Sequence, residues 1–399
     1  MKPSVFYTKE EQEFREDIRA YVQKNISEEI IAQIIEGGRT HDFEPLRKAI
    51  KILGKKNLMG SIHPKKYGGT ERGMVGEAIV AEEVAKLNGA LELTRLVTCT
   101  LFGMPLSFYG TEEQKEKYLP KICSGEYLGC IAMTEDQAGS DLAGMQTKVK
   151  KEGDDYVVNG HKKYITNGGV AELVALFAVL EDIEDKDPRK RMVGLLIDTK
   201  NTKGFNIVEQ FDLAGMEGAS NVRMEFDEMV VPGNMRLGTE GQGWDILMSE
   251  LNEERCGMAA DCVGFAQEAF NIALKYSNER VQFGRPISRQ QAISFRIADA
   301  YTRIQAARLL TLEAARYIDM HDRAATISAS MAFAYGSEML LKVSEGMLLT
   351  LAGEGVAHRA KEAAVFHRMG PIMWVVGGTT DVQKHIIQRE LYMSLKKKK

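Results

Sequence analysis

The chain contains no run of 18 apolar residues, no Cys-x-x-Cys pair, no internal repeat and no low-complexity linker. The lack of such a run excludes a conventional transmembrane helix, and the lack of a cysteine pair argues against a disulfide framework or a zinc site. We interpret the five cysteines, an odd number in a chain of 399 residues, as reduced and mostly buried thiols. The chain starts with a charged amphipathic segment and no apolar leader, so we expect a cytoplasmic protein.

An excess of charge of either sign is also missing. The 52 basic and 56 acidic residues leave a net charge of −4. Nucleic acids and anionic membranes attract proteins through clustered positive charge, so this balance predicts neither partner. The cysteine pattern offers no metal ligands, and we predict no metal.

The hydrophobic pattern divides the chain into three parts and predicts an α+β protein. Residues 1–125 have helical periodicity, and Thr8 followed by Glu11 has the spacing of a capping box. Residues 126–235 change to period two with frequent Gly, Asp and Asn turns, which predicts a β domain. Residues 236–399 return to helical periodicity over segments long enough for a bundle. The longest helices that we expect cover residues 75–87, 91–108, 246–279, 291–320, 324–351 and 382–395.

Two strand ends that carry hydroxyl groups stand out in the β part. The segment 131–144 runs from an apolar stretch into Thr134 and Ser140, and the segment 160–168 ends at Thr166. Both segments break into glycine-containing turns, so each presents hydroxyls and free backbone N–H groups. As a pair they suit a ligand with many hydrogen-bond acceptors, whereas each threonine alone is an ordinary strand residue.

These segments resemble the flavin-binding signature of the acyl-CoA dehydrogenases, through Met133-Thr134-Glu135, Gly139-Ser140-Asp141 and Tyr164-Ile165-Thr166-Asn167-Gly168. The resemblance continues in the family's order through residues 226–232, 241–244, 280–284 and 378–381. It implies an α-helical N-terminal domain, a middle β-barrel and a C-terminal four-helix bundle. It also implies FAD as cofactor, an acyl-CoA substrate, electron-transferring flavoprotein as electron acceptor and a homotetramer.

The resemblance further implies roles around FAD. Thr134 and the backbone after Met133 would reach the N1/O2 edge of the flavin, and Thr166 would reach N5. These atoms become electron-rich when a hydride arrives, so donors are needed there. Other residues expected at the cofactor are Gly139, Ser140 (at the pyrophosphate), Tyr164, Thr379, Thr380 and Asp381, the last being shorter than the usual Gln or Glu.

A further set matches positions that contact the adenosine-pyrophosphate end from a neighbouring subunit. These residues are Arg280, Gln282, Phe283 and Gln291. A guanidinium suits a pyrophosphate because it donates two hydrogen bonds, although a cation is also favoured simply at a helix end. The family's Gln-x-x-Gly-Gly-x-Gly segment appears here as residues 349–355, where the Gln and one Gly are missing. The Gly-x-Arg turn of the family appears as residues 215–217, without the Arg.

The catalytic base of many family members has no counterpart in this chain. A Glu commonly precedes the Gly-Thr of the late turn, but here Gly377 occupies that position and keeps only its backbone N–H, which would donate to the thioester oxygen. The isovaleryl-CoA, long-chain and crotonobetainyl-CoA types place a Glu before an Arg on the first bundle helix, and here Glu254 precedes Arg255. We therefore expect Glu254 to be the base, against the alternative of a solvated helix-face carboxylate. Asn252 and Arg255 match positions near the pantetheine and the base, and Ser140 also matches a substrate contact.

The substrate is less sharply predicted. Glycine at 377 would leave volume that suits a branched or cyclic acyl group. Glu92 and Arg95 lie one turn apart on a helix that lines the acyl pocket in the family, and we expect them to pair with each other. If they contact substrate instead, Arg95 would bind a dicarboxylic thioester, or Glu92 would act as an unusual base on a ring.

Alternative functions remain open at this point. The same residues would serve an enoyl-CoA reductase working in the reverse direction, a flavin oxidase or monooxygenase, or an enzyme that acts on a carrier protein instead of CoA. A non-catalytic, nucleic-acid-associated family member is disfavoured by the net charge and by Glu254.

Overall fold

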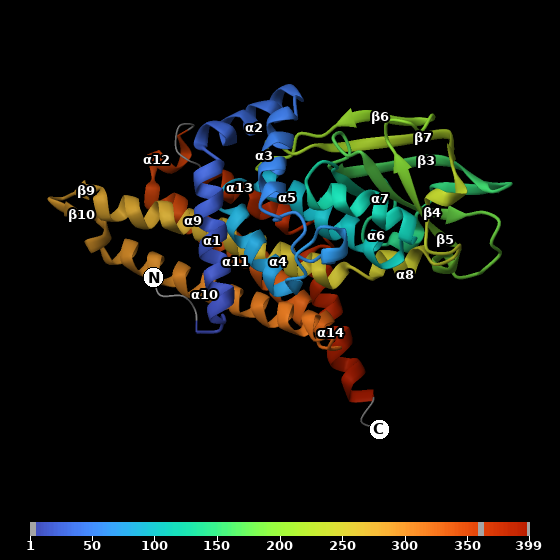
Figure 1. Cartoon of the computed structure of the whole chain (residues 1–399). Helices are drawn as coiled ribbons and strands as arrows, with labels where there is room; N and C mark the ends of the chain where they lie inside the picture. Colours follow the sequence, from blue (N-terminus) through green and yellow to red (C-terminus); the bar gives the residue numbers. More distant parts are fainter. Residues whose placement is uncertain (1–4, 358–362, 397–399) are drawn as a thin grey trace.

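The computed structural model describes residues 5–357 and 363–396. It has a helical N-terminal part, a β-sheet on one side and a long helical C-terminal part (Figure 1). The N-terminal helices are α1 (Lys9–Asn25), α2 (Glu28–Thr40), α3 (Glu44–Lys55), α4 (Gly73–Ala85), α5 (Gly89–Leu96), the π-helix Val97–Phe102, α6 (Gly103–Tyr109) and α7 (Glu112–Cys123).

Helix α4 is the central helix of this part. All its residues from Met74 to Ala85 are buried, because α4 packs against α1 on one side and against α9 and α10 on the other. Helix α1 begins with the predicted capping box: the Glu11 N–H donates to Thr8 Oγ1 and the Thr8 N–H donates to Glu11 Oε2. The predicted helix 91–108 is not one regular helix, since the π-helix interrupts it.

The middle domain is an open sheet. Its strands are β1 (Gly129–Ala132), β2 (Lys148–Glu152), β3 (Asp155–Thr166), β4 (Leu173–Leu180), β5 (Met192–Asp198), β6 (Phe205–Gln210), β7 (Asn221–Val231) and β8 (Arg236–Leu237). The order is β6-β7-β3-β2-β4-β5-β8, with β1 pairing in parallel with β4. The end strands β6 and β8 do not pair, so the sheet does not close into the expected barrel, while the α+β class is as predicted.

The C-terminal part consists of α8 (Gly243–Met248), α9 (Leu251–Glu279), α10 (Gln291–Asp319), α11 (Ala325–Leu351), α12 (Gly353–Val356), α13 (Ala363–Met373) and α14 (Thr380–Lys396). The predicted helix 246–279 breaks at residues 249–250, and α13 was not predicted. A short hairpin, β9 (Val281–Gln282) and β10 (Arg285–Pro286), joins α9 to α10 and projects from the far end of the bundle (Figure 1). Short 3₁₀ helices cover Lys65–Tyr67, Leu142–Gly144, Pro188–Arg191, Gly233–Met235 and Ile287–Arg289.

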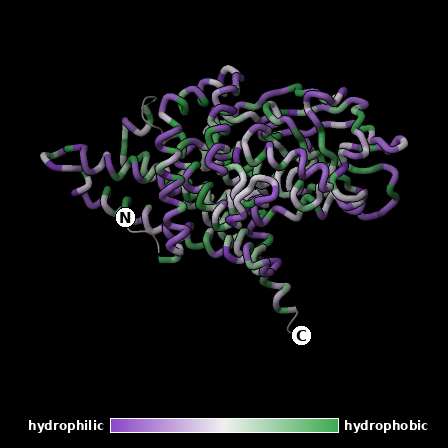
Figure 2. Tube along the Cα trace, in the orientation of Figure 1, coloured by the Kyte–Doolittle hydropathy of each residue, from purple (hydrophilic) through white to green (hydrophobic). Residues whose placement is uncertain are grey.

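Apolar and polar residues alternate along most of the long helices (Figure 2), as expected when one face of each helix is buried. Within the described ranges, no helix is both long and apolar enough to cross a membrane.

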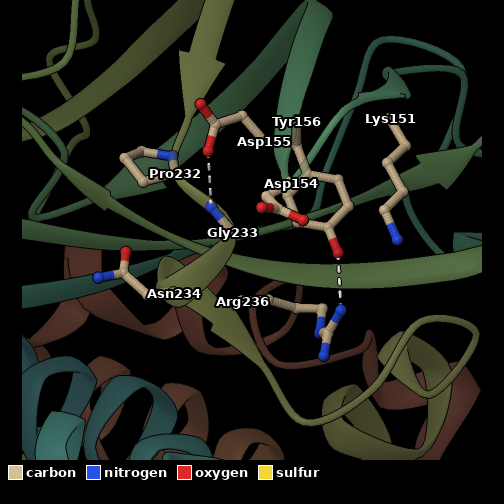
Figure 3. Close-up of a pocket in the computed structure, with 8 residues that line it drawn as sticks. All are labelled: Lys151, Asp154, Asp155, Tyr156, Pro232, Gly233, Asn234 and Arg236. Carbon is tan, nitrogen blue, oxygen red and sulfur yellow. Dashed lines mark hydrogen bonds between the residues drawn. The ribbon is translucent and has the colours of Figure 1, made fainter.

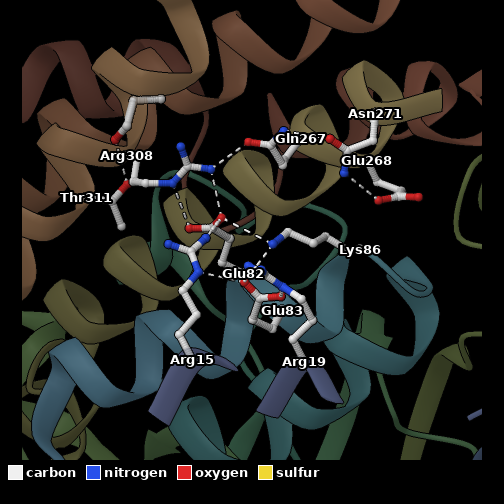
Figure 4. A network of polar contacts seen from close by, with 11 residues as sticks. Arg15, Arg19, Glu82, Glu83, Lys86, Gln267, Glu268, Asn271, Arg308 and Thr311 are labelled. Atoms are coloured by element: carbon white, nitrogen blue, oxygen red, sulfur yellow. Dashed lines mark hydrogen bonds and ion pairs between the residues drawn. The ribbon is translucent and has the colours of Figure 1, made fainter. Parts of the chain in front are cut away.

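An ion-pair network connects α1 and α10 to α4 (Figure 4). Glu82 accepts hydrogen bonds from Arg308, at 2.8 and 3.0 Å, and from Arg15. Glu83 accepts from Arg15 at 2.7 Å and from Arg19 at 2.9 and 3.0 Å. The cations outweigh the burial cost of the Glu83 carboxylate, and its pKa is lowered to about 2. The network borders a cavity of about 620 Å³ between α1, α9 and α10.

Candidate functional site

The two predicted strand ends lie side by side. Met133 and Thr134 are half-buried and follow β1 directly, and the Lys163 N–H of β3 donates to the Thr134 carbonyl at 2.9 Å. In the described part of the chain the Thr134 N–H donates to no acceptor. Thr166 is half-buried at the end of β3, where its Oγ1 accepts from the Asn221 side chain at 3.0 Å. The two segments therefore meet at the bond between Lys163 and Thr134, and the first of them carries a donor without an acceptor among the described residues.

Tyr164 stands out from this strand because of a bulge. The pairing of β3 with β7 shifts register between Lys162 and Ile165, and Tyr164 has φ 58°. A positive φ turns its side chain away from the regular alternation, so its ring is 53% exposed and lies 4.8 Å from the Phe211 ring. Gly139 and Ser140 are exposed in the turn that follows Thr134. The exposed ring, the free N–H and the exposed turn fit one face of a planar cofactor and its phosphates.

The turn that contains Gly377 and Gly378 is held in place by a residue that the sequence analysis missed. Gln383 is fully buried, and its side chain donates to the carbonyls of Gly377 at 3.1 Å and Gly378 at 2.9 Å. Both glycines have positive φ, 59° and 80°, which explains why this turn needs glycine. The Gly377 N–H donates to no acceptor in the described part of the chain. It therefore remains available to a ligand, as expected.

The three residues beside this turn that we expect at the cofactor lie at the start of α14. Thr379 Oγ1 accepts from the Val382 N–H at 3.2 Å, and Thr380 Oγ1 lies 3.3 Å from Ser337 Oγ. Asp381 is exposed in the first turn of α14. The first of these hydroxyls thus caps α14.

Glu254 lies next to Gly377. A β-carbon on Gly377 would be 3.2 Å from Glu254 Oε1 and 2.6 Å from Met258 Sδ. Glu254 is 4% exposed, so it is not a solvated helix-face carboxylate. Burial raises its pKa to about 7, against the opposing effect of Arg255. The expectation that glycine leaves free volume is only partly met, because Met258 and Glu254 occupy the space nearest to it.

The N-cap of α9 is a second buried carboxyl that the sequence analysis did not single out. Glu250 is fully buried, and neither of its oxygens has a hydrogen-bond partner within the described residues. Its carbonyl accepts the Glu254 N–H at 2.9 Å, so the two carboxyls follow each other along one helix face. Burial and then the Glu254 charge raise the pKa of Glu250 well above its usual range. Half-buried Asn252 donates to Thr326 Oγ1 at 3.3 Å, and Arg255 is 7% exposed.

Glu92 and Arg95 pair with each other, as predicted. Arg95 Nε and Nη2 donate to the two Glu92 oxygens at 2.7 and 2.6 Å, and Nη2 also donates to Glu77 at 2.6 Å. Arg95 Nη1 donates to the Leu58 carbonyl at 3.3 Å. Both members are fully buried. Burial raises the pKa of Glu92 to about 7, because the nearby Arg95 only partly compensates for desolvation.

The residues expected to contact a neighbouring subunit lie apart from this site. Arg280, Gln282 and Phe283 are exposed at the hairpin, and Gln291 is exposed at the start of α10. The Phe283 side chain is 93% exposed. A single chain therefore does not bring them to the strand ends, which agrees with their expected use by another copy.

A separate hollow of about 420 Å³ lies at the edge of the sheet (Figure 3). Arg236 donates there to the Tyr156 hydroxyl at 2.8 Å, and the Gly233 N–H donates to Asp155 at 3.2 Å. Its lining contains none of the predicted site residues.

Known proteins match the chain over its whole length. Models of the acyl-CoA dehydrogenase N-terminal, middle and C-terminal domains match residues 8–126, 130–229 and 241–392. An acyl-CoA dehydrogenase from Bacillus subtilis is 34% identical over 386 residues, which cover 96% of this chain and 98% of the relative. A cyclohex-1-ene-1-carbonyl-CoA dehydrogenase from Geobacter metallireducens is 34% identical over 346 residues, which cover 85% of this chain and 88% of the relative.

Among solved structures, butyryl-CoA dehydrogenase from Megasphaera elsdenii superposes with a TM-score of 0.88 at 28% identity, covering 98% of this chain and 100% of that one. The three-part fold and the site agree with these matches. The class of protein is a flavin-dependent oxidoreductase. The chain belongs to the acyl-CoA dehydrogenase family. FAD is its cofactor, and the free Thr134 N–H and exposed Tyr164 ring fit that group.

Proposed function

We propose that the protein desaturates the α,β bond of an acyl-CoA, with Glu254 as the base that removes the α-proton. The observation that carries this proposal is the 3.2 Å between Glu254 Oε1 and the place where a side chain at position 377 would begin. The two positions that supply the base in different family members would thus deliver a carboxylate to one place. Glycine at 377 leaves that place to Glu254.

The chain's own groups divide the work. The free Gly377 N–H donates to the thioester oxygen, which makes the α-hydrogen more acidic. Glu254 accepts that proton, and a carboxyl with a pKa of about 7 is well matched to accept it near neutral pH. Bound FAD would supply the acceptor for the β-hydrogen, which leaves as a hydride, and the product would be an enoyl thioester. We further propose that electron-transferring flavoprotein takes up the electrons. The active enzyme that we propose is a homotetramer.

The acyl group that we favour is branched or cyclic. Met258 borders Gly377, and methionine adapts its shape more easily than a branched side chain. The relative from Geobacter metallireducens is named for a cyclic acyl-CoA. A dicarboxylic acyl group is disfavoured, because both edges of Arg95 are already bound to protein oxygens.

A second candidate is a dehydrogenase that removes its proton further along a ring. The supporting observation is Glu92, a second fully buried carboxyl with a pKa of about 7. In that case Glu92→Gln, and not Glu254→Gln, would abolish reduction of FAD by a cyclic acyl-CoA.

Anaerobic bleaching of the FAD absorbance tests the proposal with straight, branched, cyclic and dicarboxylic acyl-CoAs. With the best substrate we expect Glu254→Gln to slow bleaching by about 10²–10⁴-fold. Glu253→Gln is the matched control on the same helix turn, because Glu253 is half-buried and belongs to no proposed contact. Bleaching by Glu254→Gln at the wild-type rate would reject the base assignment.

A further inference from the structure

A buried ion pair lies directly behind the strand end that carries Thr134. Lys162 on β3 and Glu135 after β1 both have fully buried side chains, with Lys162 Nζ 2.7 Å from Glu135 Oε1. The ammonium also donates to the Met133 carbonyl at 3.1 Å. Burying two charges costs several kcal/mol per ion before they attract each other, so such a pair is weak evidence for stability alone.

Glu135 links this pair to the turn that contains Gly139 and Ser140. Its carboxylate accepts the N–H groups of Gln146 at 2.6 Å and Thr147 at 3.0 Å, and the Gln137 side chain at 2.6 Å. These bonds connect both ends of the turn that contains Gly139 and Ser140. One pair therefore joins three segments: the end of β1, this turn and β3.

The contact to Met133 acts on one peptide group. The Met133 carbonyl and the Thr134 N–H belong to the same peptide unit, and this N–H donates to nothing else in the described chain. The Thr134 carbonyl, which belongs to the next peptide unit, accepts the Lys163 N–H at 2.9 Å, so the chain is also held on the far side of Thr134. A cation that hydrogen-bonds the carbonyl draws electron density from the peptide and makes its N–H a stronger donor.

We propose that Lys162 is a positioning residue for FAD: it fixes and polarises the Met133–Thr134 peptide, whose N–H then stabilises the electron-rich edge of the reduced flavin. The proposal rests on FAD lying against Thr134, but not on Glu254 or on any acyl group. It goes beyond the proposed function, because it assigns the redox balance of the cofactor to a side chain that does not touch it.

The competing explanation is that the pair only holds the loops together. Two variants separate the explanations. Lys162→Met removes the cation and strands a buried carboxylate. Lys162→Met with Glu135→Gln removes both charges and keeps one of the two acceptor oxygens that bind the Gln146 and Thr147 N–H groups. Loss of both charges with retained shape is often nearly neutral for stability, so the double variant should fold even if the single one does not.

The matched control is the neighbouring ion pair of Lys163 and Asp136, 2.9 Å long and partly exposed. Lys163→Met removes a cation one residue further along β3 without touching the Met133 carbonyl. Each full-length holoenzyme is examined by spectroelectrochemical titration of bound FAD and by thermal unfolding with and without FAD.

For the double variant we expect the preference for reduced over oxidised FAD to weaken about tenfold, which is a shift of about 30 mV to more negative potential for a two-electron couple. Folded variants that no longer retain FAD would favour the competing explanation, because loosened loops alone predict that loss, and would overturn the proposal. Lys163→Met should keep the wild-type potential. A wild-type potential and wild-type FAD retention in the double variant would overturn the proposal, as would failure of both variants to fold. A negative result for Glu254→Gln in acyl-CoA bleaching leaves these readouts unaffected.

Discussion

At the scale of single residues, the site depends on carboxyls that are buried without a full set of partners. Among the described residues, Glu254 has no ion-pair partner and the nearby Glu250 has no hydrogen-bond partner. An unsatisfied buried polar group costs about 1–3 kcal/mol. Glu250 is such a group and lies one turn before Glu254, so the burial of these two carboxyls lowers stability.

The first prediction concerns the pH dependence of activity. A base must be ionised to accept a proton, and burial raises the pKa of Glu254 to about 7. We expect kcat/KM to rise with pH through about 7 in the wild type, and the residual rate of Glu254→Gln to lack this limb. Stopped-flow reduction of FAD between about pH 5.5 and 9 measures this pH dependence in both proteins. A limb of the same midpoint in the variant would mean that another group titrates.

The second prediction concerns the pH dependence of stability. In the unfolded chain the Glu254 carboxyl releases its proton near pH 4.5, but in the folded chain only near 7. Folded protein therefore binds more protons in that window, and the wild type loses stability as pH rises through it, by up to roughly 3 kcal/mol from this group. Denaturant unfolding should show that Glu254→Gln removes this loss. Glu13→Gln on the exposed face of α1 is the control, and a parallel profile in Glu254→Gln would contradict the assigned burial cost.

At the scale of elements, hydrophobic periodicity predicted the long helices of the C-terminal part. The long helices at 291–320, 324–351 and 382–395 agree with α10, α11 and α14 to within about two residues, because each buries one continuous face. The break before α9 was missed, since Glu250 and Leu251 continue the helical pattern. Closure of the sheet was also mispredicted, because pairing of β6 with β8 is a long-range event without a local signal.

The site was predictable where a motif carries it, and not where tertiary contacts do. Thr134, Thr166, Gly377 and Glu254 followed from the resemblance. The structure joins the segments that carry the two threonines through the Lys163–Thr134 bond, and it places Glu254 beside Gly377. Gln383, Lys162 and Glu250 were missed, because their sequence context gives no sign of burial. Lys162 contacts a segment that is distant in the sequence, Gln383 reaches back to the turn before its own helix, and Glu250 is buried without a hydrogen-bond partner among the described residues.

The third prediction belongs to the element boundary after α11. Ala352 stands where the family pattern has glycine, and it adopts φ 53° and ψ −129°, a conformation that suits glycine. Such strain costs on the order of 1–3 kcal/mol, from which the extra flexibility of an unfolded glycine takes back about 0.5–1 kcal/mol. We therefore expect Ala352→Gly to raise the free energy of unfolding by about 1 kcal/mol, measured by denaturant titration. Ala329→Gly, inside α11, should instead destabilise, and a loss of stability in Ala352→Gly would refute the strain.

At the scale of the whole molecule, the hairpin between α9 and α10 is the feature that a single chain does not explain. Phe283 and Gly284 both have positive φ, 51° and 73°, as in a two-residue turn that ordinarily takes Asn-Gly. Phenylalanine is strained there, and its side chain is 93% exposed. Val281 and Phe295 add further exposed apolar surface at this end, so the end is built to be covered.

The fourth prediction compares the effect of Phe283→Asn on the stability of the isolated chain with its effect on assembly. Phe283→Asn supplies the residue that the turn prefers, so the isolated chain should unfold at the same or a slightly higher denaturant concentration. If the hairpin reaches FAD and a second copy, the same variant should lose FAD on dilution. Its sedimentation should also give a smaller mass than the wild-type tetramer that we expect, which has four chains of 44.5 kDa. Phe108→Ser on α6, a 54% exposed phenylalanine remote from the bundle end, should change neither property. Sedimentation velocity with detection of flavin absorbance measures assembly and FAD retention in one experiment, and a Phe283→Asn protein that keeps both would show that the exposed ring serves neither.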